Sequence, residues 1–170
     1  QAGGGGSFVT PRPRRGLGSF GHGSPQLASR FAKELNVDII TCRSAHEVLQ
    51  ICERHFSGLS PVNAVTGLHR IASSFDGASV LGVTMFGALI DKVACGLCVH
   101  DDATTLANIA WAFAKLDIDD SPLLSSISSS AIRRIRDFDS QGMANSAWSY
   151  AVLAVRDTPL IEATSASSIR

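Results

Sequence analysis

The sequence predicts an all-α fold, an α-solenoid of stacked antiparallel helix pairs with a repeat of about 37–42 residues. Three observations predict it. One segment recurs after 37 residues, helix-start signals return at similar intervals, and the apolar residues between them follow the spacing of a single helix face. Because one such pair cannot cover its own apolar face, neighbouring pairs are expected to stack and bury it.

The recurrence relates residues 104–124 to residues 141–161, with nine identities in 21 aligned positions. Both tryptophans and both Ser/Thr-Pro-Leu triplets stay in register, which chance alignment rarely achieves. The identical pairs are Ala107/Ala144, Asn108/Asn145, Ala110/Ala147, Trp111/Trp148, Ala114/Ala151, Leu116/Leu153, Asp120/Asp157, Pro122/Pro159 and Leu123/Leu160. A fainter copy aligns residues 65–72 with residues 107–114 after a shift of 42. We interpret the pattern as an internal repeat.

One helical domain is expected over residues 24–170, and it contains four helix pairs. The pairs cover approximately residues 24–58, 60–97, 103–136 and 140–170. In the first pair, Ser24-Pro25 is typical of a helix start. The capping box Ser44-Ala-His-Glu47 starts the second helix, and Gly58 ends it.

The second and third pairs carry similar signals. Ser60-Pro61 starts a helix, and the apolar residues 79–97 predict a helix that is buried between its neighbours. The third pair is expected to begin with a helix over about residues 103–116, rich in alanine, and Ser121-Pro122 is expected to cap its second helix. Alanines let helices approach closely, whereas the tryptophan fills the space between neighbouring pairs.

Composition limits the function classes. Hydrophobic residues make up 45% of the 170 residues, and the formal net charge is zero. Residues 1–23 are rich in Gly, Pro and Arg and predict a disordered leader, either an organelle transit peptide or a flexible linker. Residues 34–170 contain ten basic and fifteen acidic residues, so they lack the bulk basic character of a non-specific nucleic-acid binder.

The sequence contains no run of eighteen apolar residues, so it predicts no membrane span. Because the sequence stops at Arg170, within an expected helix, we interpret the chain as a fragment of a longer array.

The run Leu106–Ala114 (LANIAWAFA) and its copy Met143–Ala151 (MANSAWSYA) resemble octotricopeptide-repeat proteins. They also resemble the related FAST kinase-like leucine-rich and RNA-editing substrate-binding complex proteins. A likeness to the opening segment of such arrays begins near Leu35, so the resemblance covers roughly residues 33–170. It implies an α-solenoid that binds organellar RNA in a mitochondrion or plastid. Two departures stand out: no RAP-type domain is recognised within these 170 residues, and the first copy lacks the tryptophan.

A polar line remains on the first helix of each pair once the apolar stripe is removed, for example Thr105, Asn108, Ala112 and Lys115. Amides and hydroxyls can hydrogen-bond the base edges of unpaired RNA, and Arg or Lys can stack on bases or contact phosphates. The candidate RNA-binding residues are Asn63, Thr66, Arg70, Thr105, Asn108, Lys115, Asn145 and Ser149. Two alternatives stay open: the line is merely a solvated face, or Asn108 and Asn145 bond a neighbouring backbone.

Other side chains receive a structural interpretation. Trp111 and Trp148 could stack on bases, but core packing is favoured. Cys95-Gly-Leu-Cys98 with His100, together with Cys52-x-x-His55, could supply zinc ligands, yet cysteine in an apolar helix usually behaves as a small hydrophobe. No catalytic residue, metal, cofactor or small-molecule substrate is predicted, and the chain is not expected to be an enzyme.

Two functions compete at this point. The first is an organellar RNA-binding helical repeat protein that acts in RNA processing, stability or translation on single-stranded RNA. The second is a protein–protein scaffold within a ribonucleoprotein assembly, without direct RNA contact. The slightly acidic composition of residues 34–170 favours the second function, whereas the resemblance favours the first.

Overall fold

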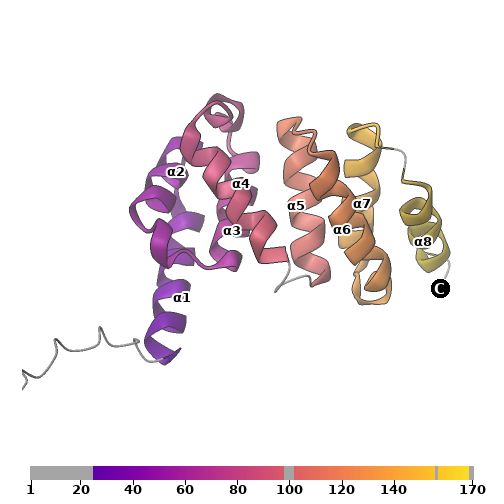
Figure 1. The fold of residues 1–170 in the computed structure, drawn as a ribbon, viewed down its shortest axis with the longest axis horizontal. Coiled ribbons are helices and arrows are strands. Elements are labelled where there is room, and N and C mark those ends of the chain that lie inside the picture. The colour runs from indigo at the N-terminus through magenta and orange to yellow at the C-terminus, as the bar shows by residue number, and fades with distance from the viewer. Residues whose placement is uncertain (1–24, 98–101, 156, 169–170) are drawn as a thin grey trace, which may run out of the picture.

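A computed structural model describes residues 25–97, 102–155 and 157–168. Across these ranges the chain forms eight α-helices and three 3-10 segments without a strand, which confirms the all-α prediction. The helices follow one another in chain order along the long axis of the molecule (Figure 1). Within the same ranges no helix is long and apolar enough to cross a bilayer. The predictions for residues 1–23, Ser24, Cys98 and His100 lie outside the described residues.

Each α-helix is short, between 10 and 17 residues. The α-helices are α1 (Pro25–Thr41), α2 (Ala45–Arg54), α3 (Pro61–Ser73), α4 (Thr84–Leu97), α5 (Ala103–Leu116), α6 (Ser121–Arg133), α7 (Ser140–Val152) and α8 (Thr158–Ser168). The 3-10 segments are η1 (Phe56–Gly58), η2 (Gly77–Val80) and η3 (Ile135–Asp137).

The odd-numbered helices form one layer, in which α3 packs against α1 and α5, and α5 packs against α3 and α7. The even-numbered helices cover them: α2 contacts α3 and α4, and α6 contacts α5 and α8. The apolar core lies at these contacts and consists mainly of Leu, Ile, Val, Ala and Phe side chains. Because α5 has a neighbour on each side, nine of its fourteen residues are buried.

Three odd-numbered helices begin with the same kind of cap. A side-chain oxygen of Ser60, Asp102 or Asp139 accepts a hydrogen bond from the backbone N–H three residues later. The donors are Asn63 at 3.2 Å, Thr105 at 3.0 Å and Gly142 at 2.7 Å. Each bond satisfies an N–H group that the first helical turn leaves free. The capping residues stand 42 and 37 residues apart, like the sequence copies.

Helices α5 and α7 also end alike. Asp117 and Ala154, 37 residues apart, adopt left-handed backbone angles, with φ of 55° and 53°. The next N–H group donates to a carbonyl five residues earlier in each case. These bonds join Ile118 to Phe113 at 2.9 Å and Val155 to Tyr150 at 3.0 Å. This geometry is a Schellman motif, so α5 and α7 end with the same kind of turn.

Three sequence expectations need correction. Gly58 was expected to end the second helix, but α2 ends at Arg54, and Gly58 ends η1 instead. Ser121 was expected to cap α6, but the carboxylate of Asp120 does so by accepting the Leu123 N–H at 3.1 Å, and Ser121 is the first helical residue. The helix expected over residues 79–97 begins only at Thr84, because residues 77–80 form η2. Helix α4 is also not buried all round, since Cys95 is exposed on its outer side.

Candidate nucleic-acid interface

The solvent-facing side of the odd-numbered helices carries corresponding side chains on α3, α5 and α7. On α5 the exposed or partly exposed line is shifted from the predicted one, because Ala112 is fully buried and Trp111 is not. We call the following residues the odd-helix face: Val62, Thr66, His69 and Ser73 on α3; Thr104, Asn108, Trp111 and Lys115 on α5; Gln141, Asn145, Trp148 and Val152 on α7. Corresponding residues are again 42 and 37 residues apart, so each of the four positions on α3 has a counterpart on α5 and another on α7. We call each set of three corresponding residues a row.

Two predicted site residues are buried and leave the candidate interface. The Asn63 side chain is only 1% exposed, and its amide donates to the Ala32 carbonyl at 2.8 Å and to Asn36 Oδ1 at 3.2 Å. Asn63 therefore joins α3 to α1. Ser149 is fully buried, and its hydroxyl donates to the Asn145 carbonyl at 2.6 Å. The polar character of both residues serves internal hydrogen bonds, as expected for buried polar groups.

Two further predicted residues are held by the protein. The Thr105 hydroxyl donates to Asp102 Oδ2 at 2.7 Å and so belongs to the cap of α5. Arg70 Nη2 donates to the Cys42 carbonyl at 2.7 Å, and Arg70 Nε is buried. The Thr66 hydroxyl donates to the Val62 carbonyl within its own helix but stays partly exposed. Of the predicted residues, Thr66, Asn108, Asn145 and Lys115 remain on the odd-helix face.

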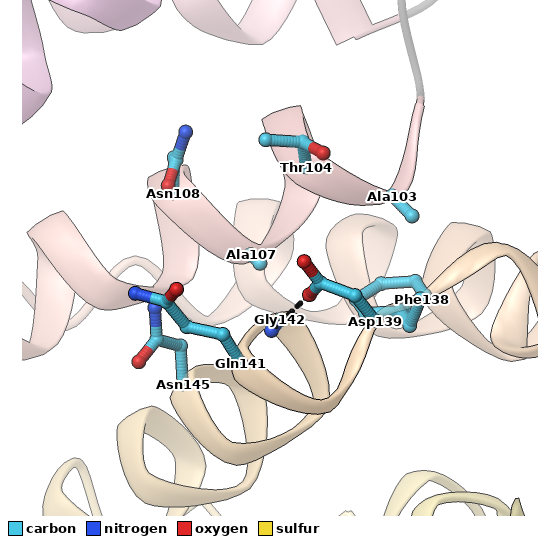
Figure 2. A pocket seen from close by; sticks show the side chains of 9 residues that line it. All are labelled: Ala103, Thr104, Ala107, Asn108, Phe138, Asp139, Gln141, Gly142 and Asn145. Atoms are coloured by element: carbon cyan, nitrogen blue, oxygen red, sulfur yellow. Dashed lines mark hydrogen bonds between the residues drawn. The ribbon is translucent and has the colours of Figure 1, made fainter.

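A pocket of about 150 Å³ opens between the N-terminal halves of α5 and α7. Figure 2 shows Thr104 and Asn108 along α5 and Gln141 and Asn145 along α7, on either side of the pocket. Gly142 lies closely packed in the pocket lining, because a Cβ atom there would stand 3.1 Å from Asp139 Oδ1 and 3.3 Å from the Phe138 ring. The pocket is therefore a shallow polar depression in which neighbouring helices of the layer expose amide groups to solvent.

The amides of this pocket are available to a ligand. Asp139 Oδ1 is engaged by the Gly142 N–H, the one bond drawn among the lining residues in Figure 2. Within the described ranges, no hydrogen bond engages the side-chain amides of Asn108, Gln141 or Asn145. The alternative that Asn108 and Asn145 bond a neighbouring backbone is therefore not what the structure shows. Each amide offers donors and an acceptor, the groups that bind base edges.

A row of rings runs beside the amide row. The rings of His69 and Trp111 lie with centroids 4.8 Å apart and planes inclined by 31°. Trp148 holds the corresponding position on α7, has no ring contact with Trp111 among the described residues, and is 43% exposed. The sequence interpretation placed both tryptophans in the core. That interpretation is wrong for Trp148, while Trp111 is partly buried at the edge of the core. The signal that could have shown this is the repeat itself, since His69 aligns with both tryptophans.

The charge on the odd-helix face is low. Lys115 is the only Lys or Arg of the face and is exposed. Burial, with a smaller contribution from the charge of Arg70, lowers the pKa of His69 below its usual value, so the ring is uncharged at neutral pH. Asp102 and Asp139 stand at the opposite end of α5 and α7 from Lys115. The face therefore offers rings and amides and little positive charge for phosphates.

Two of the possible zinc ligands, Cys98 and His100, lie outside the described residues. The described residues contain no group of three or more His, Cys, Asp or Glu side chains placed to hold a metal ion. Cys52 is fully buried, and burial raises the pKa of its thiol to about 12. A thiol with this pKa stays protonated near neutral pH.

Comparison with known proteins identifies one distant relative. The chain is 28% identical over 138 residues to a curated rice protein (Oryza sativa subsp. japonica) named "RAP domain-containing protein, chloroplastic". The aligned part covers 69% of this chain and 22% of that protein, so the chain spans about a fifth of the length of its relative. No family model matches the chain. No solved structure matches it either.

Proposed function

We propose that this chain is part of an RNA-binding α-solenoid of the octotricopeptide-repeat type that acts on single-stranded RNA in a plastid. The observation that carries the proposal is the odd-helix face, where amides and rings stand in corresponding positions on successive helices. The solenoid arrangement is supported by the shared caps and Schellman turns, which recur with the spacing of the sequence copies. The chloroplastic name of the rice relative supports the plastid.

The geometry suits unpaired RNA better than a duplex. Bases that are not paired expose hydrogen-bonding edges and flat faces, and a groove with free amides and rings can bind both. Asn108 and Asn145 lie on neighbouring helices at one level of the pocket, so a single strand that crosses from α5 to α7 meets one amide on each helix. RNA processing, stability and translation are all compatible with such binding.

The test is a binding titration of the full chain with fluorescently labelled single-stranded RNA. We expect the double variant Asn108→Ala/Asn145→Ala to bind about tenfold more weakly, because the two lost hydrogen bonds, at about 0.7 kcal/mol each, together contribute about 1.4 kcal/mol. Gln50→Ala is the matched control, since Gln50 is an exposed amide on α2, outside the odd-helix face. Absence of binding by the unaltered chain, or equal affinity of the double variant, would contradict the proposal.

A second candidate function, a protein scaffold in a ribonucleoprotein assembly, is favoured by the low positive charge of the odd-helix face, where Lys115 is the only Lys or Arg. If the scaffold function holds, the full chain shows no salt-dependent binding to labelled single-stranded RNA. Salt-dependent binding would count against it.

A further inference from the structure

We infer that bases of single-stranded RNA stack on the row formed by His69, Trp111 and Trp148, and that this stacking supplies most of the affinity. The inference rests on the proposed function and adds to it a mode of binding and a class of contact. It concerns the bases rather than the sugar–phosphate backbone.

The three rings share one position on three successive helices of a layer. Helix α5 packs against both α3 and α7, so the row crosses adjacent packed helices. The rings of His69 and Trp111, 4.8 Å apart, lie within stacking distance of each other. At this separation and an inclination of 31° the two rings lie largely face to face, and both side chains stay partly exposed.

Trp148 leaves a large part of its ring in water, with 43% of the side chain exposed. A tryptophan face is among the largest apolar surfaces that a side chain can offer, and its exposure is unfavourable until something covers it. Asn145 stands three residues earlier on the same helix and exposes a free amide. A base lying on Trp148 can therefore present its edge to that amide. Stacking tolerates every base, because each base has a π face.

The surrounding charges argue against binding through phosphates. Arg70 is held by the Cys42 carbonyl, and Lys115 is the only Lys or Arg of the face. Two acids, Asp102 and Asp139, cap the same helices. The logarithm of affinity for a single strand falls with the logarithm of salt by about 0.7 per neutralised phosphate. One or two phosphate contacts therefore predict a slope no steeper than about −1.5.

The experiment titrates the full chain with a labelled oligouridine of about twelve nucleotides and with an abasic oligomer of equal length and charge. Anisotropy gives affinity, and tryptophan emission reports contact with the rings. We expect quenched emission, a shallow salt slope, and affinity for the abasic oligomer at least about tenfold weaker. Trp148→Ala is expected to weaken oligouridine binding about tenfold, whereas Trp148→Phe keeps a ring and stays within about threefold. Ile161→Ala, which removes an exposed apolar side chain from α8, is the matched control and leaves affinity unchanged.

The outcomes separate this inference from the proposed function. If the abasic oligomer binds as tightly as oligouridine, or if Trp148→Ala binds like the unaltered chain, base stacking on this row is overturned while RNA binding stands. If no single strand binds, both ideas fail. Circular dichroism of each variant shows whether weak binding comes from loss of the helical fold. Trp148→Phe is expected to fold, because the side chain at this position is partly exposed.

Discussion

Helices α5 and α7 carry copies of one sequence pattern, yet they differ in burial. In α5, Ala107, Ala110 and Ala114 are 2%, 0% and 6% exposed, because α3 and α7 cover the helix from both sides. The copies of these alanines in α7 are exposed, since within the described ranges α7 has α5 as its odd-numbered neighbour on one side alone. Burial of these alanines is therefore decided by the neighbours of the helix and not by its own sequence.

Local structure, by contrast, is the same in both helices. Each begins at an aspartate cap and ends near a residue with left-handed backbone angles. The N–H group after that residue donates to the carbonyl five residues earlier in both helices. The first and last turns depend on residues adjacent in sequence, and those residues are shared or equivalent. Substitutions at positions where the copies agree test the structure that they share. Substitutions at positions where they differ test the effect of the neighbouring helices.

The largest effect is expected where the copies agree. Phe113 is fully buried and Tyr150, its counterpart, is nearly so. Phe113→Ala removes a complete core side chain and leaves a cavity, so we expect the free energy of unfolding to fall by about 3–5 kcal/mol. Urea denaturation followed by circular dichroism measures it. Val152→Ala on the exposed side of α7 is the control and stays within about 0.5 kcal/mol. A loss below about 1 kcal/mol in Phe113→Ala would show that the core is loosely packed.

The sharpest contrast lies in one substitution made at two equivalent positions. Ala110→Leu inserts a larger side chain into a filled space and is expected to lower the free energy of unfolding by about 1–3 kcal/mol. Ala147→Leu places the same group on an exposed surface and is expected to change it by less than about 0.5 kcal/mol. Both values come from the same denaturant titration. Equal losses at the two sites would mean that the outer side of α7 is covered in solution.

A smaller effect, of the opposite sign, is expected at the helix ends. Ala154 has a φ of 53°, which an alanine adopts only at a cost of about 1 kcal/mol. Ala154→Gly removes that cost, and we expect a gain of about 0.5–1 kcal/mol in differential scanning calorimetry. Asp117→Gly is expected to gain less, because aspartate tolerates left-handed angles better than alanine. A destabilised Ala154→Gly would argue against the left-handed turn.

The smallest effect on stability is expected at His69, which stands where α5 and α7 have a tryptophan. Burial lowers the pKa of His69, so the folded chain binds its proton less readily than the unfolded chain. The stability contributed by the uncharged ring is present above the unfolded pKa, near 6.5, and is lost as the pH falls through the lower folded value. We expect the melting temperature to decrease from neutral pH towards about pH 5. In His69→Phe this decrease should be smaller; an identical pH profile would remove His69 as its cause.

The sequence predicted the helices well because their boundaries depend on neighbouring residues. Ser60 followed by Pro61, and Ser44 followed by Glu47, gave starts that the structure contains. The start of α4 at Thr84 has no comparable signal, because η2 (Gly77–Val80) precedes it and no capping side chain marks it. The predicted start at residue 79 was therefore several residues early.

The candidate site was predicted less well, for a physical reason. Helix α5 carries alanine on several sides, so the sequence does not distinguish the solvent-facing line through Trp111 from the adjacent line through Ala112. Only the packing of α3 and α7 decides between them. Asn63 looked like a surface amide but completes the capping box of Ser60, and the signal for that role was present three residues upstream.

The matching chain reversals at Asp117 and Ala154 have a consequence for mutation. Each residue added to an α-helix rotates everything beyond it by about 100° around the axis. A single-codon insertion inside α5 therefore turns its distal half, and the reversal that follows no longer places α6, and α7 after it, in their present orientations. Asn145 and Trp148 then leave their rows without being altered themselves. Insertions and deletions within α5 should consequently damage the molecule more than most replacements of one side chain by another.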